Sequence, residues 1–496
     1  MGVNLSPVAD ANGPYTGVAG VAVTLDGSGS SDPDGTIVNC EWDLDNDGEF
    51  DDATGEVIQY TWAAAYSGNI SLRVTDDAGA TDIDTTTATI TTATQCVVTF
   101  NFADQNGYLT GTGEERVYVD GFGWKADGGQ ITVKPGDTIS YRAYFKEGSG
   151  LYGPKVTFTV TGTMTLDVMF HTLTMDFENQ NGDLNAAAGI GTGEERVYID
   201  NVGYKADGDN VTVPLNSAVA HRAYFKQGSG LYGPKNTTNV DGSFTELKVL
   251  FYTLTMDFED QSGDLNPAGG IGTGEERVYI DNVGYKADGG TVAVPLGSTV
   301  YHRAYYKEGS GLYGPKNTTN IDGTSGELRV LFHTLTMDFE DQSGDLNAAA
   351  GIGTGEERVY IDNVGYKADG DNVTVPLNSA VAHRAYFKQG SGLYGPKNTT
   401  SVDGSFTELK VLFRSISFEV VDSNTKDPIG GAQVYVDNVG YISNSGTIIV
   451  PFGSTIQHKA KVGNTWSAVN SKLIDASWSK CTYEWDGVGF SPPGYE

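Results

Sequence analysis

A short acidic segment near the N-terminus has the residue types and spacing of a cation-binding loop. Its alternating carboxylates are Asp43, Asp45, Asp47, Glu49 and Asp51. Side chains in this pattern, with a glycine such as Gly48 at the sharp turn, converge on one hard cation through oxygen ligands in calcium loops. The segment lacks the flanking helices and the closing bidentate Glu of an EF-hand. We therefore predict a Ca²⁺ site, approached by Asp32 and Asp34 from a neighbouring loop; the alternative is a solvated acidic turn.

A second acidic pattern recurs three times further along the chain. Its members are Asp176, Glu178 and Asp183; Asp257, Glu259 and Asp264; and Asp338, Glu340 and Asp345. Carboxylates crowded into one loop without compensation repel one another, and a bound cation removes that repulsion. This spacing is less specific than that of the first segment. The prediction of further Ca²⁺ sites therefore stands beside that of exposed acidic loops.

Charged and aromatic residues gather in two neighbouring segments, EERVY and RAYFK. These segments place Glu194, Arg196 and Arg222 on adjacent strands, and Tyr232 follows in the next loop. Mixed charges on adjacent strands form cross-strand pairs or an interface between modules. The alternative is a carbohydrate platform, in which Tyr204, Tyr224 and Tyr232 stack on sugar rings. Because tyrosines at strand spacing usually belong to a core or an interface, we predict an interface.

The histidines and the motifs of the chain do not predict catalysis. His221, His302, His383 and His458 occupy one repeated position, where the first copy has Tyr141. Tyrosine is a poor replacement for a histidine that ligates a metal or acts as a base, so these residues are interpreted as structural. The sequence has no nucleophile elbow, HExxH or P-loop motif and no convincing pair of catalytic acids. We predict that the protein is not an enzyme.

Several Asn-x-Ser/Thr sequons fall at equivalent positions of the chain. Those predicted to be glycosylated are Asn236, Asn317, Asn398, Asn210 and Asn372. The first three recur in one loop after the sequence GPK, which indicates an exposed position. Chance alone supplies a few sequons in a Thr-rich chain.

Internal repetition determines the domain organisation. GTGEERVY begins at Gly111, Gly191, Gly272 and Gly353, and GSGLYGPK recurs with the same spacing. Residues 171–251 and 333–413 differ at three positions, Asn179/Asp341, Asn181/Ser343 and Asn239/Ser401. A fifth copy has lost both motifs but keeps VYVDNVGY at 434–441, as expected of a terminal repeat. Duplication of this kind is typical of spacers and adhesive surfaces.

Turn residues and alternating apolar residues predict an all-β chain of stacked sandwich modules. Leu247, Val249 and Phe251 alternate on odd positions, and Leu254 and Met256 follow on even ones. The inward face therefore flips inside continuous strand sequence, so one sandwich ends where the next begins and the modules form a stiff rod. The predicted domains are 1–93, 94–170 (repeat 1), 171–251 (repeat 2), 252–332 (repeat 3), 333–413 (repeat 4) and 414–496 (divergent capping repeat 5).

Two parts of the chain resemble known families. LDGSGSSDPDG (25–35), CEWDLDNDG (40–48), YTW (60–62) and SLRVTDDAGATD (71–82) resemble the motifs of a PKD domain, in the same order. The resemblance implies an immunoglobulin-like sandwich of a surface protein, with Trp42 in its core. FEVVDSNTKDPIGGAQVYVD (418–437) resembles the start of carboxypeptidase-regulatory-like or PEGA-type modules, which implies transthyretin-like sandwiches. The central repeats resemble no named family.

The charge of the chain limits its partners. With 31 basic and 64 acidic residues, the net charge is −33. Such a field repels nucleic acid and anionic membranes and attracts cations. The three cysteines match no metal or redox spacing, and no stretch has the apolar length of a membrane span. Because Met1 and Gly2 lead directly into polar sequence, we expect any secretion signal or anchor to lie outside these residues.

These observations lead to two hypotheses. The preferred one is a non-enzymatic, calcium-stabilised structural or adhesive protein of the cell surface, such as a stalk, envelope component or filament subunit. Its partners would be other copies of itself or other envelope proteins. The alternative is a carbohydrate-binding accessory region of a large secreted enzyme, with polysaccharide as the partner.

Overall fold

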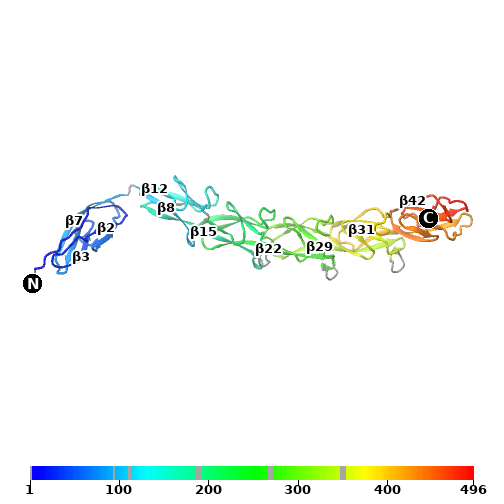
Figure 1. The fold of residues 1–496 in the computed structure, drawn as a ribbon, viewed down its shortest axis with the longest axis horizontal. Helices are drawn as coiled ribbons and strands as arrows, with labels where there is room; N and C mark the ends of the chain where they lie inside the picture. The colour runs from blue at the N-terminus through cyan, green and yellow to red at the C-terminus, as the bar shows by residue number, and fades with distance from the viewer. Residues whose placement is uncertain (1–2, 93–94, 110–112, 185–191, 266–271, 347–353) are drawn as a thin grey trace.

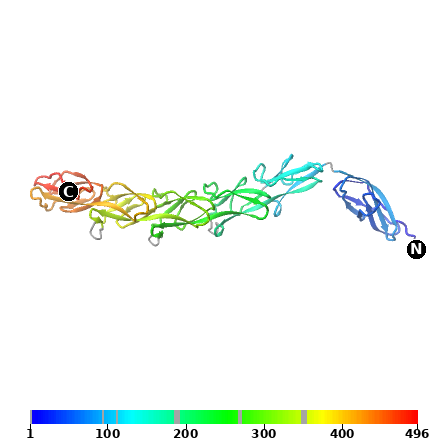
Figure 2. The ribbon, with the colours of Figure 1, turned by 180° about the vertical axis from the view of Figure 1, so that it is seen from behind.

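The chain forms an elongated row of β-sandwich modules (Figure 1). The computed structural model describes residues 3–92, 95–109, 113–184, 192–265, 272–346 and 354–496. Every regular element in these ranges is a β-strand, so the prediction of an all-β tandem rod is confirmed. None of the described elements is an apolar helix of membrane-spanning length. The two ends of the chain lie at opposite ends of the row, also when it is seen from behind (Figure 2).

The N-terminal domain is a two-sheet sandwich with its own core. Its strands are β1 (Tyr15–Val18), β2 (Val23–Asp26), β3 (Ile37–Asp43), β4 (Ala53–Thr54), β5 (Val57–Tyr60), β6 (Tyr66–Asp76) and β7 (Thr81–Thr91). One sheet has the order β1-β7-β6-β3-β4, and β2 pairs with β5 in the other. Trp42 is fully buried in the centre, as predicted, and its indole N–H donates to the carbonyl of Gly55 at 2.9 Å.

One long sheet runs through all the repeats. Its main strands are β8 (Cys96–Asp104), β15 (Met164–Asn179), β22 (Glu246–Asp260), β29 (Glu327–Asp341), β36 (Glu408–Asp422) and β43 (Lys480–Trp485). Each pairs in parallel with the next, and the second half of β15 (Thr174 to Glu178) lies beside the first half of β22 (Glu246 to Leu250). A strand of 15 residues spans about 50 Å. The four longest of these strands, β15, β22, β29 and β36, therefore each contribute to two successive modules, which we number 1 to 5 after the repeats.

Shorter strands extend this sheet within each module. Antiparallel partners of the long strands are β12 (Gln130–Val133), β19 (Asn210–Pro214), β26 (Thr291–Pro295), β33 (Asn372–Pro376) and β39 (Thr447–Pro451). The ends of β8, β15, β22 and β29 each form a hairpin with a two-residue strand that follows directly in the sequence. These short strands are β9 (Gly107–Tyr108), β16 (Gly182–Asp183), β23 (Gly263–Asp264) and β30 (Gly344–Asp345).

A separate small sheet covers each module. In module 1 this sheet contains β10 (Arg116–Val119), β11 (Gly123–Lys125), β13 (Thr138–Tyr144) and β14 (Val156–Thr159), and in module 2 it contains β17 (Arg196–Ile199), β18 (Gly203–Lys205), β20 (Ser217–Tyr224) and β21 (Asn236–Val240). Module 3 has β24 (Arg277–Ile280), β25 (Gly284–Lys286), β27 (Thr299–Tyr305) and β28 (Asn317–Asn320). Module 4 has β31 (Arg358–Ile361), β32 (Gly365–Lys367), β34 (Ser379–Tyr386) and β35 (Asn398–Val402). Module 5 has β37 (Gln433–Val436), β38 (Gly440–Ser443), β40 (Thr455–Val462), β41 (Thr465–Trp466) and β42 (Asn470–Leu473).

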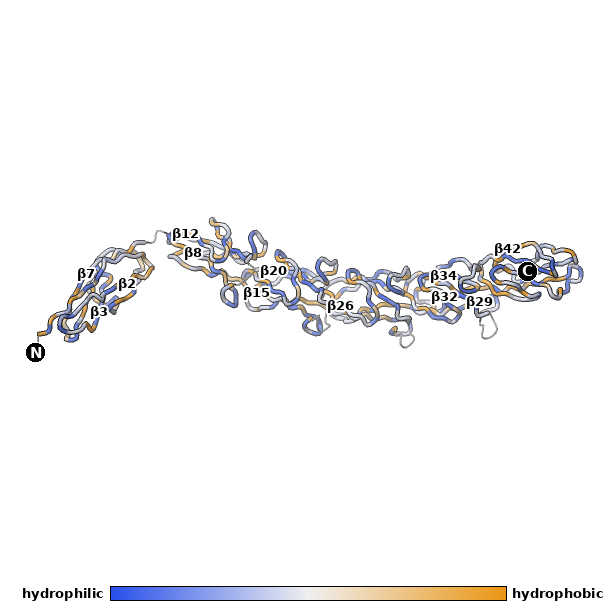
Figure 3. The backbone as a smooth tube through the Cα atoms, viewed as in Figure 1, coloured by the Kyte–Doolittle hydropathy of each residue, from blue (hydrophilic) through white to orange (hydrophobic). Residues whose placement is uncertain are grey.

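The buried residues fall into one cluster per module. Along β22, Leu247, Val249 and Phe251 are buried with module 2, whereas Leu254 and Met256 are buried with module 3. The change of parity means that the two halves of one strand turn their apolar side chains into different cores. Hydrophobic and hydrophilic residues are interspersed along the whole row of modules (Figure 3).

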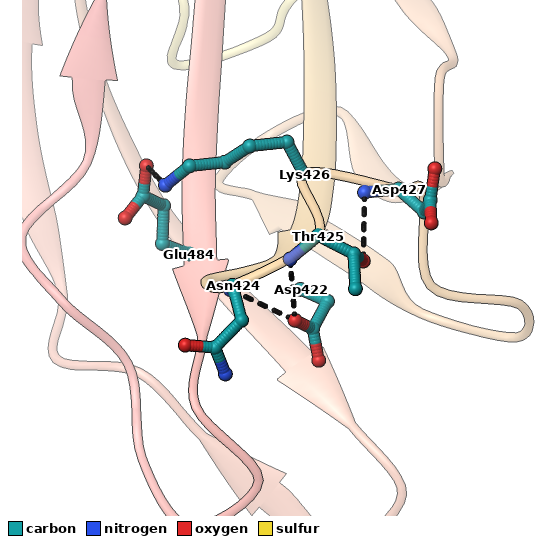
Figure 4. A network of polar contacts seen from close by, with 6 residues as sticks. All are labelled: Asp422, Asn424, Thr425, Lys426, Asp427 and Glu484. Carbon is teal, nitrogen blue, oxygen red and sulfur yellow. Dashed lines mark hydrogen bonds and ion pairs between the residues drawn. The ribbon is translucent and has the colours of Figure 1, made fainter.

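Module 5 completes its own sheet. β43 pairs in parallel with β36, in the position that the next module's long strand occupies elsewhere, and β44 (Gly494–Tyr495) pairs with β43. The turn after β36 makes its polar contacts within module 5 (Figure 4). Asp422 accepts hydrogen bonds from the backbone N–H groups of Asn424 and Thr425 at 2.8 and 3.0 Å. Lys426 forms an ion pair with Glu484 of β43 at 2.5 Å.

Candidate functional site

The predicted calcium loop begins at the end of β3. Asp43 is buried, and its two carboxylate oxygens accept hydrogen bonds from the backbone N–H groups of Asn46 (2.6 Å) and Gly48 (3.1 Å). Both donors have positive φ, +61° and +91°, which produces the tight turn. One oxygen each of Asp43, Asp45 and Asp47 lies within 4.8 Å of the others. Three convergent carboxylates are suitable ligands for a divalent cation with oxygen ligands.

Two other predicted ligands, Glu49 and Asp51, are not members of this group. Asp52 is instead the residue that closes the loop, because its carboxylate accepts hydrogen bonds from the backbone of Leu44 at 2.6 Å and Asp45 at 3.1 Å. Desolvation, together with the charges of Asp52, Asp47 and Asp43, raises the pKa of Asp45. Excess negative charge therefore remains in the loop.

Asp32 and Asp34, which were predicted to approach the loop, are not members of the group formed by Asp43, Asp45 and Asp47. Asp34 accepts a hydrogen bond from the backbone of Leu5 at 3.2 Å, and Asp77 accepts one from Thr36 at 3.2 Å. Oδ2 of Asp32 is buried and has no hydrogen-bond partner among the described residues. A Cβ atom added to Gly35, which lies between Asp34 and Thr36, would meet the carboxylates of both Asp32 and Asp77.

The acidic groups of modules 2 to 4 lie on the outer face of the long sheet. Asp176, Glu178 and Asp183 converge within 4.8 Å, as do their counterparts in modules 3 and 4. The premise that these carboxylates lack compensation is wrong. Lys248 of the neighbouring strand lies 2.5 Å from Glu178 and 3.6 Å from Asp176.

The same compensation occurs in the next two modules. Arg329 pairs with Glu259, and Lys410 lies 2.5 Å from Glu340. Burial, followed by repulsion from the adjacent glutamate, nevertheless raises the pKa of Asp176, and Asp257 and Asp338 show the same direction. Calcium binding at the repeat clusters stays a prediction.

The aromatic residues predicted to form an interface lie on the outer face of the small sheet. Arg222 lies over the ring of Tyr232 at 4.7 Å, and the rings of Tyr198, Tyr204 and Tyr224 continue the contact edge to face. Tyr232 is 44% exposed. We call this surface, with Arg196 and its equivalents in modules 1, 3 and 4, the Tyr–Arg face. Its other members are Arg116, Arg142, Tyr118, Trp124, Tyr144 and Tyr152; Arg277, Arg303, Tyr279, Tyr285, Tyr305 and Tyr313; and Arg358, Arg384, Tyr360, Tyr366, Tyr386 and Tyr394.

Of the other predicted interface residues, Arg196 stabilises the loop that leads into the small sheet. Arg196 donates to the carbonyls of Gly193 and Glu195 at 3.0 and 2.7 Å. The buried carboxylate of Glu195 accepts hydrogen bonds from Thr192, while Glu194 is exposed.

Residues of GSGLYGPK next to Tyr232 contact the following module. Leu231 is 3% exposed and belongs to the core cluster of module 3, and the N–H of Gly230 donates to Asn282 of that module at 3.3 Å. Adjacent positions of one segment thus serve different purposes: Leu231 joins two modules, whereas Tyr232 lies on the surface.

Sequence reasoning missed a recurrent contact at the junctions. The amide of Gln180 donates to the carbonyl of Thr253 at 2.7 Å and accepts from its N–H at 2.9 Å, and the amide of Asn179 donates to the Thr253 hydroxyl. We call this contact the junction clamp. Equivalent glutamines are Gln105 with Thr172, Gln261 with Thr334 and Gln342 with Ser415. The signal was the repeated turn sequence D/N-Q-N/S-G, in which Ser423 replaces the glutamine in module 5.

The repeated histidines are buried inside the small sheets. His221 is 5% exposed and its Nε2 lies 3.0 Å from the hydroxyl of Thr238, with the same arrangement at His302 and His383. Burial lowers the pKa of all three. Burial lowers the pKa of His458 to about 4, and this side chain contacts Tyr483 at 2.7 Å.

The predicted glycosylation sites lie at the surface. Asn236, Asn317 and Asn398 are exposed first residues of β21, β28 and β35. Asn210 and Asn372 are exposed as well, but their side-chain amide oxygens accept hydrogen bonds from the hydroxyls of Thr174 and Thr336 at 2.8 Å. Glycosylation of these residues stays a prediction.

The fold and these surfaces define a multidomain β-sandwich protein. Residues 4–92 match the family model of the PKD domain, and this part of the chain belongs to the PKD domain family. It is similar to the PKD1 domain of Vibrio anguillarum Epp, with 30% identity over 18% of this chain and 100% of that chain and a TM-score of 0.16.

Two further solved structures resemble longer parts of the chain. A structure described as a carbohydrate-binding module of the β-sandwich superfamily has 16% identity, covers 49% of this chain and 88% of its own, and has a TM-score of 0.17. The Bacillus anthracis TIE protein has 9% identity, with 67% and 75% covered and a TM-score of 0.15. Neither likeness assigns a ligand to the repeats.

Proposed function

We propose that this protein is a non-enzymatic extracellular spacer of a cell surface, which holds its N-terminal PKD domain away from its C-terminal end. Its partners are other copies of the chain or other envelope proteins. Calcium bound by Asp43, Asp45 and Asp47 stabilises the PKD domain. A role in adhesion or in a filament is compatible with the same shape.

The sharing of each long strand between two modules carries this proposal. β15, β22, β29 and β36 pass from one core into the next, and the junction clamps fix the turn of one module to the backbone of the following one. Modules joined by flexible linkers move independently. Modules joined by a common strand hold a fixed direction, which suits a spacer.

The alternative is a carbohydrate-binding accessory region of a large secreted enzyme. The exposed aromatic rings of the Tyr–Arg face favour it, since tyrosine rings stack on sugars through their apolar faces. Binding of a neutral glycan array by the intact chain, lost on Tyr232→Ala, would select this alternative.

Small-angle scattering and immunolabelling test the main proposal together. We expect a particle roughly 150–250 Å long, from strands of about 3.3 Å per residue. Antibodies against the chain should label intact, non-permeabilised cells of the source organism. A compact particle, or label seen only after permeabilisation, would contradict the proposal.

A further inference from the structure

The two outer faces of each sandwich module carry opposite charge. On one side, the Tyr–Arg face of module 2 presents Arg196 and Arg222 among four tyrosines. On the other, the outer face of the long sheet carries an excess of carboxylates. We call the second surface the acidic face; its members in modules 2 to 4 are Asp176, Glu178, Asp183, Glu246, Lys248 and Leu250; Asp257, Glu259, Asp264, Glu327, Arg329 and Leu331; and Asp338, Glu340, Asp345, Glu408, Lys410 and Leu412.

The acidic face is not neutralised by its own cations. In module 2, four carboxylates face one ammonium group, that of Lys248. Burial is the main cause of the raised pKa of Asp176, and repulsion from Glu178, Asp183 and Glu246 adds to it, while Lys248 acts in the opposite direction. A further cation at this surface would relieve the repulsion.

Apolar groups lie beside the charges on both faces. Leu250, Leu331 and Leu412 are 49%, 46% and 51% exposed on the acidic face, and Leu250 lies directly opposite Glu178 in the register. Tyr232, Tyr313 and Tyr394 are 44–45% exposed on the Tyr–Arg face. Contact between such surfaces would bury leucine and tyrosine together with the paired charges.

We propose that the Tyr–Arg face of one rod binds the acidic face of a second copy of this chain, side by side. The inference rests on the proposed function as a surface rod and names the surface by which such rods associate. Both faces recur in modules 2, 3 and 4, so each of these three modules offers contacts of the same kind. Each contact is weak alone, because exposed ion pairs contribute little. Linked contacts reinforce one another, because each raises the effective concentration of the next.

A second copy fits this surface better than an acidic polysaccharide does. The net charge of −33 opposes the approach of a polyanion and of a second copy alike, so the preference depends on the local complementarity of the two faces. A second rod presents the complementary acidic face with the same module spacing. Because the two faces are different surfaces on opposite sides of each sandwich, the contact does not close into a dimer. Such heterologous contacts generate open-ended assemblies.

Sedimentation of the full chain at low ionic strength tests the proposal. We expect species that grow with protein concentration, with a weight-average sedimentation coefficient roughly twofold or more above that of the monomer, and dissociation at about 0.5 M salt as charges are screened. Replacing Arg222, Arg303 and Arg384 with Gln should abolish the growth. A matched control, Thr81, Thr87 and Thr89→Glu on the exposed side of β7, changes the net charge equally and should leave it intact.

A charge exchange identifies the partner surfaces. The chain with Arg222, Arg303 and Arg384→Glu, and the chain with Glu246, Glu327 and Glu408→Lys, should each be monomeric alone and should associate when mixed. Monomeric wild-type chain at low salt, or no association of the mixture, overturns the proposal. Polygalacturonate that sediments with monomeric wild-type chain, and not with the Arg→Gln variant, overturns it too and assigns the Tyr–Arg face to an acidic glycan. Scattering separates failure of this contact from failure of the proposed function. If the chain does not associate but scatters as an elongated particle, only the contact between rods is wrong.

Discussion

The side-chain amide of Gln180 forms two hydrogen bonds with the backbone of Thr253, 73 residues further along the chain. The amide thereby behaves like one more peptide unit of the sheet, added from the preceding module. This contact recurs at four junctions among the described residues, and it gives each module a fixed orientation on the next.

Removal of the clamps should soften the rod. Gln180, Gln261 and Gln342→Ala should cost about 1–2 kcal/mol at each junction, since two hydrogen bonds are lost. Urea unfolding should show the loss, and scattering should show a shorter mean end-to-end distance. Gln433→Ala, in an exposed position of β37, serves as the control. Unchanged stability and length in the triple variant would contradict a role for the clamp.

Calcium should stabilise the PKD domain through Asp43, Asp45 and Asp47. Binding at a hundredfold excess over the dissociation constant adds about 2.7 kcal/mol, which raises the melting temperature by several degrees in a domain of this size. Residues 1–93 suit the measurement, because the core cluster described for this domain is formed by residues between Ala9 and Ile90. Asp45→Asn should abolish the calcium response, whereas Asp51→Asn should retain it. The same melting temperature with calcium and with EDTA would exclude the site.

Neighbouring residues of GSGLYGPK should respond differently to truncation. Leu231→Ala removes a side chain buried in the core of module 3 and should cost about 2–5 kcal/mol. Tyr232→Ala removes a surface contact with Arg222 and should cost about 1 kcal/mol or less. Calorimetry of the full chain measures both. Equal losses would mean that Tyr232 also joins successive modules.

Acid should destabilise modules 2 to 4 through their histidines. Burial lowers the pKa of His221, His302 and His383 below 6.5, so on acidification the unfolded chain binds protons that the folded chain does not. Stability is therefore complete above the unfolded pKa and falls as the pH decreases from about 6.5. The raised pKa values of Asp176, Asp257 and Asp338 act in the opposite direction, at lower pH.

The tyrosine that module 1 has in place of histidine allows the effect of the histidines on stability to be separated from that of the aspartates. Module 1 has Tyr141 at the histidine position, so His221, His302 and His383→Tyr can be accommodated in the same sheet. Urea unfolding between about pH 7 and pH 5 should show a smaller loss of stability in this variant than in the wild type. If the free energy of unfolding falls by the same amount in the variant and in the wild type over this pH range, the histidines are not the cause.

The sequence predicted the repeated all-β architecture because its apolar residues alternate and its turns recur. It did not predict that Asn236–Val240 is a strand, since Asn-Thr-Thr-Asn has the polarity of a loop; pairing with β20 determines its conformation. The site was predicted in part. Asp43, Asp45 and Asp47 could be found from spacing, whereas Asp52 depends on how the chain returns to the loop. Gln180 and Lys248 were missed because their partners lie far away along the chain.

The stagger of the long strands determines how the rod responds to tension. A pull on the two ends of the repeat array acts along β15 and β22, so their parallel hydrogen bonds are loaded in shear and must break together. Strands joined side by side in a hairpin can instead be unzipped one bond at a time. The array should therefore extend little until one junction yields at high force. The first release of length should then correspond to a whole module, because the strand that slips belongs to two cores.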